Sequence, residues 1–292
     1  MAQIQHIEDG KYHRCFIFGC SFTQYKWTTW ANIMQAHLRV PTFTFAQPGC
    51  CNTYIWLAFN KAVRDYNIGK KDLVLFAFTG FFRKSYLNED WTHKGDYGMV
   101  MEFVDQEKQE IQKKYECYTD QFSKEMHETI LQPQGKVLQE FNILETITDK
   151  LTMLGCDWDF YSIYDYEDMF EDDLCHEKDK FHFEKLAKTI KKPAMEPFMH
   201  MYNGHNKIMR VDIPNKDNKH SDNHPTPLEH YNWLVAVYGN IFSEKIYNAV
   251  IDTQKQWEDA FFKLEDIWSN EGPWYYVPHG LFKDNLHYGD GP

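Results

Sequence analysis

Short apolar runs and amphipathic segments alternate through the N-terminal part of the chain. Residues 14–19 contain a short apolar run that is typical of a buried strand, and residues 42–46 alternate as a second strand. The apolar run over 72–78 is continuous, which is typical of a central parallel strand. Segments 25–38 and 53–67 repeat their apolar positions at helical spacing. This succession of strands and helices predicts a doubly wound α/β sheet.

The rest of the chain adds mainly helices to this sheet. We expect a loop over 85–98 and a fourth strand over 157–164. Further helices are expected over 99–131, 135–154, 181–190, 227–250 and 252–268. We therefore predict one α/β domain over 1–250, with a helical insertion over about 85–154. A C-terminal helix and an aromatic tail over 251–292 follow, and the tail is expected to run over the surface.

The composition restricts the classes of partner. The 292-residue chain has a formal net charge of −12, which argues against nucleic acid and against anionic membrane surfaces. Its 9 Trp, 18 Tyr and 22 Phe make up 17% of the residues, a surplus that suits a flat ligand such as a carbohydrate. We therefore expect a small-molecule or glycan ligand, and an oligomer or a larger assembly stays open.

Targeting signals and cysteine content bear on the compartment. No apolar run approaches the roughly 20 residues that span a bilayer. The polar start, with Glu8 and Asp9, does not resemble a signal peptide. The 7 cysteines show no repeat spacing, and a bond between adjacent Cys50 and Cys51 would be strained, so we expect reduced thiols. The chain is expected to be cytoplasmic, which is compatible with assembly into a virus particle.

The stretch from Phe16 to Thr23 carries the first candidate chemistry. It is predicted to be a buried strand that runs into a tight turn, where Gly19 allows a backbone path that a Cβ would resist. Ser21 follows at the tip of the turn. Its hydroxyl is therefore either the N-cap of a following helix or a nucleophile, and three later stretches favour the nucleophile.

The three later stretches follow predicted strands or precede a predicted helix. They are Pro48–Asn52, Phe78–Arg83 and Ser221–His230. Together with the Ser21 turn, they resemble the four sequence blocks of the SGNH (GDSL-type) hydrolase family, over roughly residues 14–240. The resemblance implies a three-layer α/β/α sandwich with a mostly parallel, flavodoxin-like sheet. It also implies that the nucleophile, the oxyanion donors and an Asp/His pair meet at one edge of this sheet.

The resemblance assigns roles to individual residues. Ser21 is the expected nucleophile, His224 the base that takes its proton, and Asp222 the carboxylate that orients the imidazole. The backbone amides of Ser21 and Gly49 are expected to donate to the oxyanion. Asn52 either adds a side-chain amide to these donors or is the N-cap of the helix that follows it.

Three positions depart from the family's pattern. Cys20 stands where the family has Asp, Gly80 stands where the third block has Asn, and the spacing from Asp222 to His224 is shortened. An Arg after the third strand suits an anionic or polyhydroxylated substrate, and a surface Arg is the alternative. The expected substrate-binding residues are Thr79, Gly80 and Arg83.

Two other chemistries compete with this site. A Cys20 thiolate near a helix N-terminus could be the nucleophile, but its side chain should point to the opposite side of the strand, so we expect it to be buried. The histidines of the second half match no zinc signature in their spacing, and we expect no metal. These histidines are His200, His205, His220, His224 and His230. The acidic residues over 165–179 lack EF-hand spacing and are expected to form a solvated face.

The sequence predicts a serine esterase that needs no cofactor. It would remove an O-acyl group, above all acetyl, from a glycan or a small ester through an acyl-serine intermediate. A glycan O-acyltransferase would use the same site with a sugar hydroxyl in place of water. The rival, motivated by Cys20 and Gly80, is a scaffold of the same fold without turnover. Such a scaffold would be a binding or structural protein, including one in a virus particle.

Overall fold

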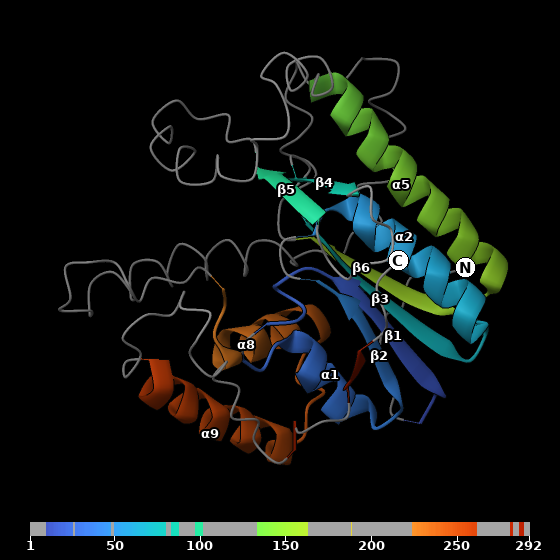
Figure 1. Ribbon diagram of the computed structural model, residues 1–292. Helices are drawn as coiled ribbons and strands as arrows, with labels where there is room; N and C mark the ends of the chain where they lie inside the picture. Colours follow the sequence, from blue (N-terminus) through green and yellow to red (C-terminus); the bar gives the residue numbers. More distant parts are fainter. Residues whose placement is uncertain are drawn as a thin grey trace, which may run out of the picture.

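A parallel sheet of five strands forms the centre of the computed structural model, in the order β6-β3-β1-β2-β7 (Figure 1). The strands are β1 (Arg14–Gly19), β2 (Thr42–Ala46), β3 (Asp72–Phe78), β6 (Asp157–Ser162) and β7 (Leu286–Tyr288). The structure describes residues 10–25, 27–47, 50–79, 83–87, 97–101, 133–162, 188, 224–261, 281–282 and 286–288.

The first three predicted strands are confirmed at their predicted bounds, and the fourth ends at Ser162. Phe18 pairs in register with Phe45 on one side and with Phe76 on the other. The three rings stack across the strands at centroid distances of 5.2 and 5.0 Å, and Phe59 of the covering helix packs edge-on against Phe18 at 5.6 Å. Part of the aromatic surplus therefore builds the core.

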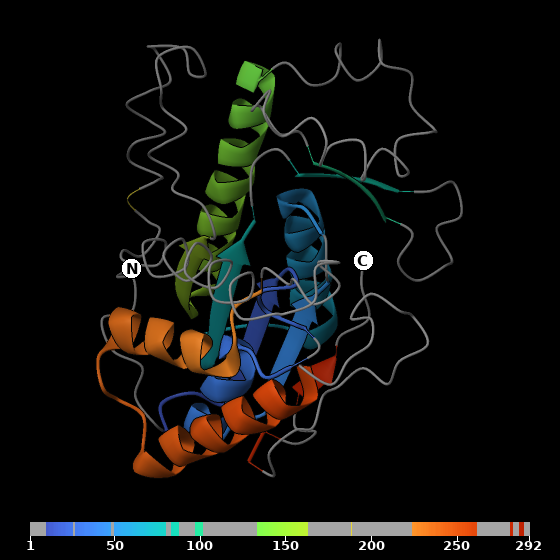
Figure 2. The same ribbon diagram turned by 90° about the vertical axis from the view of Figure 1, so that its left-hand side faces the viewer.

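Helices cover both faces of the sheet, so the predicted α/β fold is confirmed (Figures 1 and 2). The described helices are α1 (Trp30–Leu38), α2 (Asn52–Tyr66), α5 (Pro133–Leu154), α8 (Pro227–Tyr238) and α9 (Glu244–Phe261). α2 and α5 pack together on one face, and α1, α8 and α9 pack together on the other. None of these described helices is both long and apolar enough to cross a membrane.

Two helix ends differ from the predicted ones for local reasons. α2 ends because Asn67 adopts a left-handed conformation with φ of 50°, so Gly69 is not the residue that closes it. The helix predicted over 227–250 is interrupted at Gly239, whose φ is 75°. Its second part belongs to α9, which begins at Glu244 instead of 252.

An antiparallel pair of strands stands where a loop and the start of a helix were predicted. β4 (Arg83–Leu87) pairs with β5 (Tyr97–Met101) to form a separate two-stranded sheet. The prediction of a loop over 85–98 was therefore wrong at both ends. Two predicted helices lie largely outside the described residues. For the helix predicted over 181–190 only residue 188 is described, and for the helix predicted over 99–131 only residues 99–101 are described.

The C-terminal tail completes the sheet. β7 pairs in parallel with β2, with Thr42 opposite Leu286 and Thr44 opposite Tyr288. Phe282, shortly before this strand, is only 1% exposed. The prediction of a surface appendage was therefore wrong for this part of the tail, because its backbone hydrogen-bonds to an edge strand and its Phe joins the core.

A buried polar cluster joins α8 to the sheet. Asp159 of β6 is 0% exposed and accepts a hydrogen bond from the Tyr238 hydroxyl at 2.9 Å. The Tyr238 hydroxyl also contacts the hydroxyl of Tyr161, whose pKa is raised by burial and, secondarily, by Asp159. Trp233 of α8 packs edge-on against Tyr161 at 5.0 Å and against Trp30 at 5.8 Å. α8 is thus held in place by both polar and aromatic contacts.

Candidate functional site

The loops that follow β1, β2 and β3 meet at the carboxyl edge of the sheet. The Gly19 carbonyl accepts hydrogen bonds from the Gln47 amide and the Cys50 thiol, both at 3.2 Å. The Thr79 amide donates to Asn52 Oδ1 at 2.8 Å. Because β2 and β3 lie on opposite sides of β1, the chain reverses its direction across the sheet here. Open α/β sheets bind ligands in the crevice outside such a point.

Ser21 lies in a tight turn directly after β1. The Thr23 amide donates to the Cys20 carbonyl at 2.9 Å, and the Thr29 hydroxyl donates to the Thr23 carbonyl at 2.6 Å. α1 begins only at Trp30, with Thr29 as its N-cap, and not at residue 25 as predicted. Ser21 is therefore not the N-cap of this helix, which removes that alternative role. It is 6% exposed at the carboxyl edge of the sheet.

The structure brings His224 to the Ser21 turn. The imidazole stacks on the Tyr25 ring at a centroid distance of 3.7 Å and an interplanar angle of 16°. It also packs against Phe22, the residue after Ser21, at 5.2 Å. The segment with His224 leads directly into α8, which begins at Pro227 as predicted. Residues from opposite ends of the domain therefore share one small region.

Several predicted site residues are not placed together by the structure. Asp222, Gly49 and Gly80 lie outside the described residues, and for Arg83 only its backbone position at the start of β4 is described. None of the described residues forms a hydrogen bond with the Ser21 hydroxyl. The catalytic and oxyanion roles stay predictions, with Ser21 and His224 as the two members that the structure locates.

Asn52 has a different environment from either predicted one. Its Nδ2 donates to the Thr79 carbonyl at 3.0 Å and to Glu140 Oε2 at 2.7 Å, while its Oδ1 accepts from the Thr79 amide. An amide nitrogen has two hydrogens, so both are already in use and neither can reach an oxyanion. Cys51, not Asn52, is the N-cap of α2. Asn52 therefore joins α2, β3 and α5, and the predicted oxyanion role is corrected.

Thr79 belongs to the same buried network. Its residue is 0% exposed, and both of its backbone polar groups bond to Asn52. The Thr79 side chain is therefore covered in this structure, and its predicted substrate-binding role stays a prediction. Glu140 of α5, at 1% exposure, completes the network.

The structure bears on the two competing chemistries, a thiol nucleophile and a metal site. Cys20 is 0% exposed, which confirms the prediction that it packs as a small apolar side chain. The described free cysteines, all buried, are Cys15, Cys20, Cys50, Cys51 and Cys156. Within the described part of the chain, no three His, Cys, Asp or Glu side chains gather as metal ligands. His200, His205 and His220 lie outside that part.

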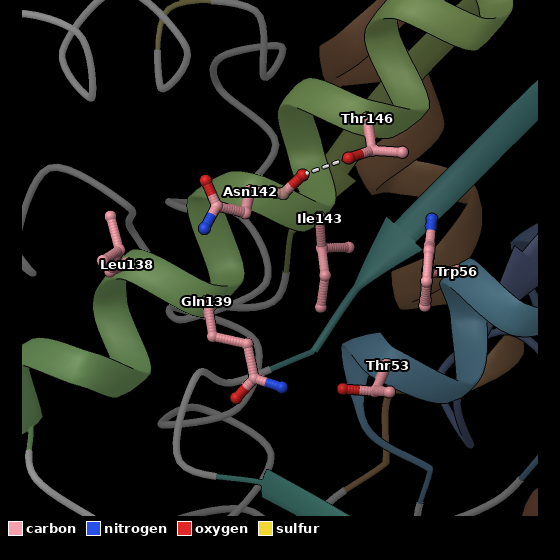
Figure 3. A pocket seen from close by; sticks show the side chains of 7 residues that line it. All are labelled: Thr53, Trp56, Leu138, Gln139, Asn142, Ile143 and Thr146. Carbon is pink, nitrogen blue, oxygen red and sulfur yellow. Dashed lines mark hydrogen bonds between the residues drawn. The ribbon is translucent and has the colours of Figure 1, made fainter.

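A groove between α2 and α5 was not predicted (Figure 3). Its volume is about 380 Å³, and no charged side chain is among the residues that line it. Figure 3 shows the side chains of Thr53 and Gln139 pointing toward each other across this groove. The lining residues are Thr53, Trp56, Leu138, Gln139, Asn142, Ile143 and Thr146. No periodicity marks such a groove, because it exists only where two helices from distant segments meet.

Sequence reasoning also missed Glu140, although a signal was present. Glu140 lies one turn before Leu144 and two turns before Ile147, both at most 1% exposed, so it shares their apolar stripe. An acidic residue on such a stripe needs a buried partner, which here is Asn52.

A scan against protein-family models and searches of the curated proteins and of the solved structures found no match for the chain.

Proposed function

We propose that the protein is a serine ester hydrolase in which Ser21 is the nucleophile and His224 is its base. The observation that supports this most is the position of His224 against the turn that carries Ser21, at the ligand-binding edge of the sheet. The resemblance of four sequence blocks to the SGNH family supports the same reading. An SGNH-type three-layer sandwich is part of this proposal.

The reaction follows the order of acyl transfer to serine. His224 accepts the Ser21 proton as the hydroxyl oxygen attacks the acyl carbonyl, and the carbonyl becomes a tetrahedral oxyanion. The backbone amides of Ser21 and Gly49 donate to that oxyanion, and Asp222 orients the imidazole. The imidazolium then protonates the leaving alcohol, which leaves an acyl-serine. Water attacks this ester with His224 again as base, and the acid and free Ser21 are released.

The substrate in this proposal is an O-acylated glycan or a small ester. The net charge of −12 disfavours polyanionic substrates by repulsion. Because the Asn52 amide is already bonded within the fold, the oxyanion would rely on backbone amides alone. Removal of one such donor raises the activation free energy by about 3 to 4 kcal/mol.

A fluorophosphonate probe tests the nucleophile directly. We expect the probe to modify the wild-type protein at Ser21, with the site mapped by mass spectrometry, and a small acetyl ester to be hydrolysed. Ser21→Ala should abolish both, whereas Cys20→Ala and the control Ser243→Ala, before α9, should retain them. Retained turnover in Ser21→Ala would refute the proposal, and loss in Cys20→Ala alone would transfer the role to the thiol.

A second candidate is a binding protein with the same fold but without turnover. Two observations favour it: Asn52 is committed to a structural network, and the Ser21 hydroxyl lacks a hydrogen-bond partner among the described residues. A folded wild-type protein that neither reacts with the probe nor hydrolyses any acetyl ester would support this candidate over the esterase.

A further inference from the structure

The backbone just before α8 is tied to the loop after β1 by an indole. Trp27 Nε1 donates a hydrogen bond to the Pro225 carbonyl at 2.7 Å, across 198 residues of sequence. Trp27 is 6% exposed, and Pro225 is also buried. A buried carbonyl needs a partner, so this bond fixes the backbone at the residue that follows His224.

The imidazole itself is held by rings from the same loop. Tyr25 stacks on His224 at 3.7 Å, and Tyr25 in turn packs edge-on against Trp27 at 4.6 Å. Phe22 packs against His224 from the other end of the loop, at 5.2 Å. Trp257 of α9 packs edge-on against Trp27 at a centroid distance of 5.5 Å. Side chain and backbone are therefore held by one continuous group of aromatic residues.

The start of α8 has anchors of its own. Thr226 and Glu229 form a capping box, in which the Thr226 amide donates to Glu229 Oε2 at 2.7 Å. The Leu228 amide donates to Gln254 Oε1 of α9 at 3.1 Å. These contacts fix the helix but not the segment before it. The aromatic residues act on that preceding segment, which carries His224.

We propose that Phe22, Tyr25 and Trp27 form an aromatic clamp that positions His224 as the base for Ser21. The clamp and the nucleophile belong to the same loop after β1, so holding His224 against this loop fixes the base relative to the serine. The inference rests on the proposed function for its catalytic meaning. A base must lie within hydrogen-bond reach of the proton it takes, and a displacement of about 1 Å can lower a rate about 100-fold.

The clamp also has an electrostatic consequence. When His224 takes the Ser21 proton, it becomes a cation stacked on the face of the Tyr25 ring. Aromatic faces attract cations, and this attraction is present only once the proton has moved. Tyr25 would therefore favour the charged state that forms during the reaction. A phenyl ring offers the same face, whereas an aliphatic side chain does not.

The main variant is Trp27→Phe, which keeps a ring but removes the Nε1 donor. Trp56→Phe is the matched control, because its Nε1 has no hydrogen-bond partner in the described structure and it lies in the groove between α2 and α5. We expect Trp27→Phe to lower kcat by about 10- to 100-fold with little change in KM, since the ester is still bound but the base is displaced. Trp56→Phe should behave as wild type.

A second measurement does not depend on turnover. Diethyl pyrocarbonate modifies accessible imidazoles, and mass spectrometry reports its rate at His224 relative to the exposed His13. Release from the clamp should raise the relative rate at His224 severalfold in Trp27→Phe and in Tyr25→Leu. Tyr25→Phe, which keeps the ring that Tyr25→Leu removes, should show the His224 reactivity and the kcat of wild type. Comparing Tyr25→Leu with Tyr25→Phe tests the clamp even if Trp27→Phe does not fold.

The outcomes separate the clamp from the esterase. The clamp would be refuted if Trp27→Phe and Tyr25→Leu both had the same kcat and the same His224 reactivity as the wild-type protein. A wild-type protein without esterase activity would overturn the proposed function and the catalytic role of the clamp. The reactivity of His224 would in that case still show whether the three aromatic residues hold the imidazole.

Discussion

Gly19 is a position where a single added methyl group should disturb the candidate site. A Cβ at this residue would lie 2.0 Å from Thr23 Oγ1 and 2.7 Å from Thr23 Cβ, well below the 3.0 Å limit that real Cβ contacts respect. Thr23 cannot move aside easily, because it is 0% exposed and its carbonyl accepts from the Thr29 hydroxyl at 2.6 Å. Gly19→Ala therefore forces the turn that carries Ser21 to shift.

The expected cost follows from overpacking. Adding a carbon to a closely packed site costs about 1 to 3 kcal/mol, and the overlap with a backbone-attached Cβ places Gly19→Ala near about 3 kcal/mol. For a chain of this size, each kcal/mol lowers Tm by roughly 2 to 4 °C, so we expect a decrease of about 6 to 12 °C. The rate of acetyl ester hydrolysis should fall as well, because the shift of the turn displaces Ser21 relative to His224.

Thermal unfolding followed by circular dichroism measures this effect. Gly69→Ala is the matched control, because no atom lies within 4 Å of its added Cβ and its φ is not in the left-handed region. Its Tm should stay at or slightly above that of wild type. Adding Thr23→Gly to Gly19→Ala removes the overlapping atoms, so the double variant should be more stable than the sum of the single effects implies. Equal Tm values for the two alanine variants would refute the reasoning.

Two further predictions concern buried polar groups. Asn52→Ala removes three hydrogen bonds and leaves Glu140 buried without this donor. Urea unfolding should therefore show a decrease of about 2 to 4 kcal/mol in the free energy of unfolding. Asn142→Ala, at an exposed position, should change this free energy little. A small loss would contradict the structural role of Asn52. Burial raises the pKa of Cys156 to about 12, against about 8.5 in an unfolded chain, so the unfolded state loses its proton first as pH rises. Between these values this thiol should lower the free energy of unfolding by about 1.4 kcal/mol per pH unit, and no such loss should come from it below about pH 8. A wild-type protein that loses no more stability above pH 9 than Cys156→Ala would contradict this.

Local patterns were sufficient for the strands because burial on both faces requires a continuous apolar run. β1 and β3 have this signature within the strands themselves, β2 is marked by its alternating Thr and Phe residues, and the bounds of all three agree with the prediction. Helix ends were less predictable, because several residues near a boundary can end or cap a helix. Both Asn67 and Gly69 suit the end of α2, and only the folded backbone shows that Asn67 adopts the left-handed conformation.

Burial of Cys20 was also predictable, since a cysteine that directly follows a buried strand packs readily as a small apolar side chain. The start of α8 was equally readable from Thr226, Pro227 and Glu229, which form an N-cap, an N1 proline and a capping box. In each case the controlling interactions lie within a few residues of sequence, so the sequence by itself contained them.

The tertiary structure alone decided which distant residues meet. It brought His224 onto Tyr25, committed Asn52 to Glu140, placed Leu286–Tyr288 beside β2, and opened a groove between α2 and α5. Each of these contacts joins segments far apart in the chain, and a sequence pattern records only that a side chain is apolar, polar or aromatic. Its partner depends on the sheet order and on how the helices pack, because these set the distances between side chains in the folded chain.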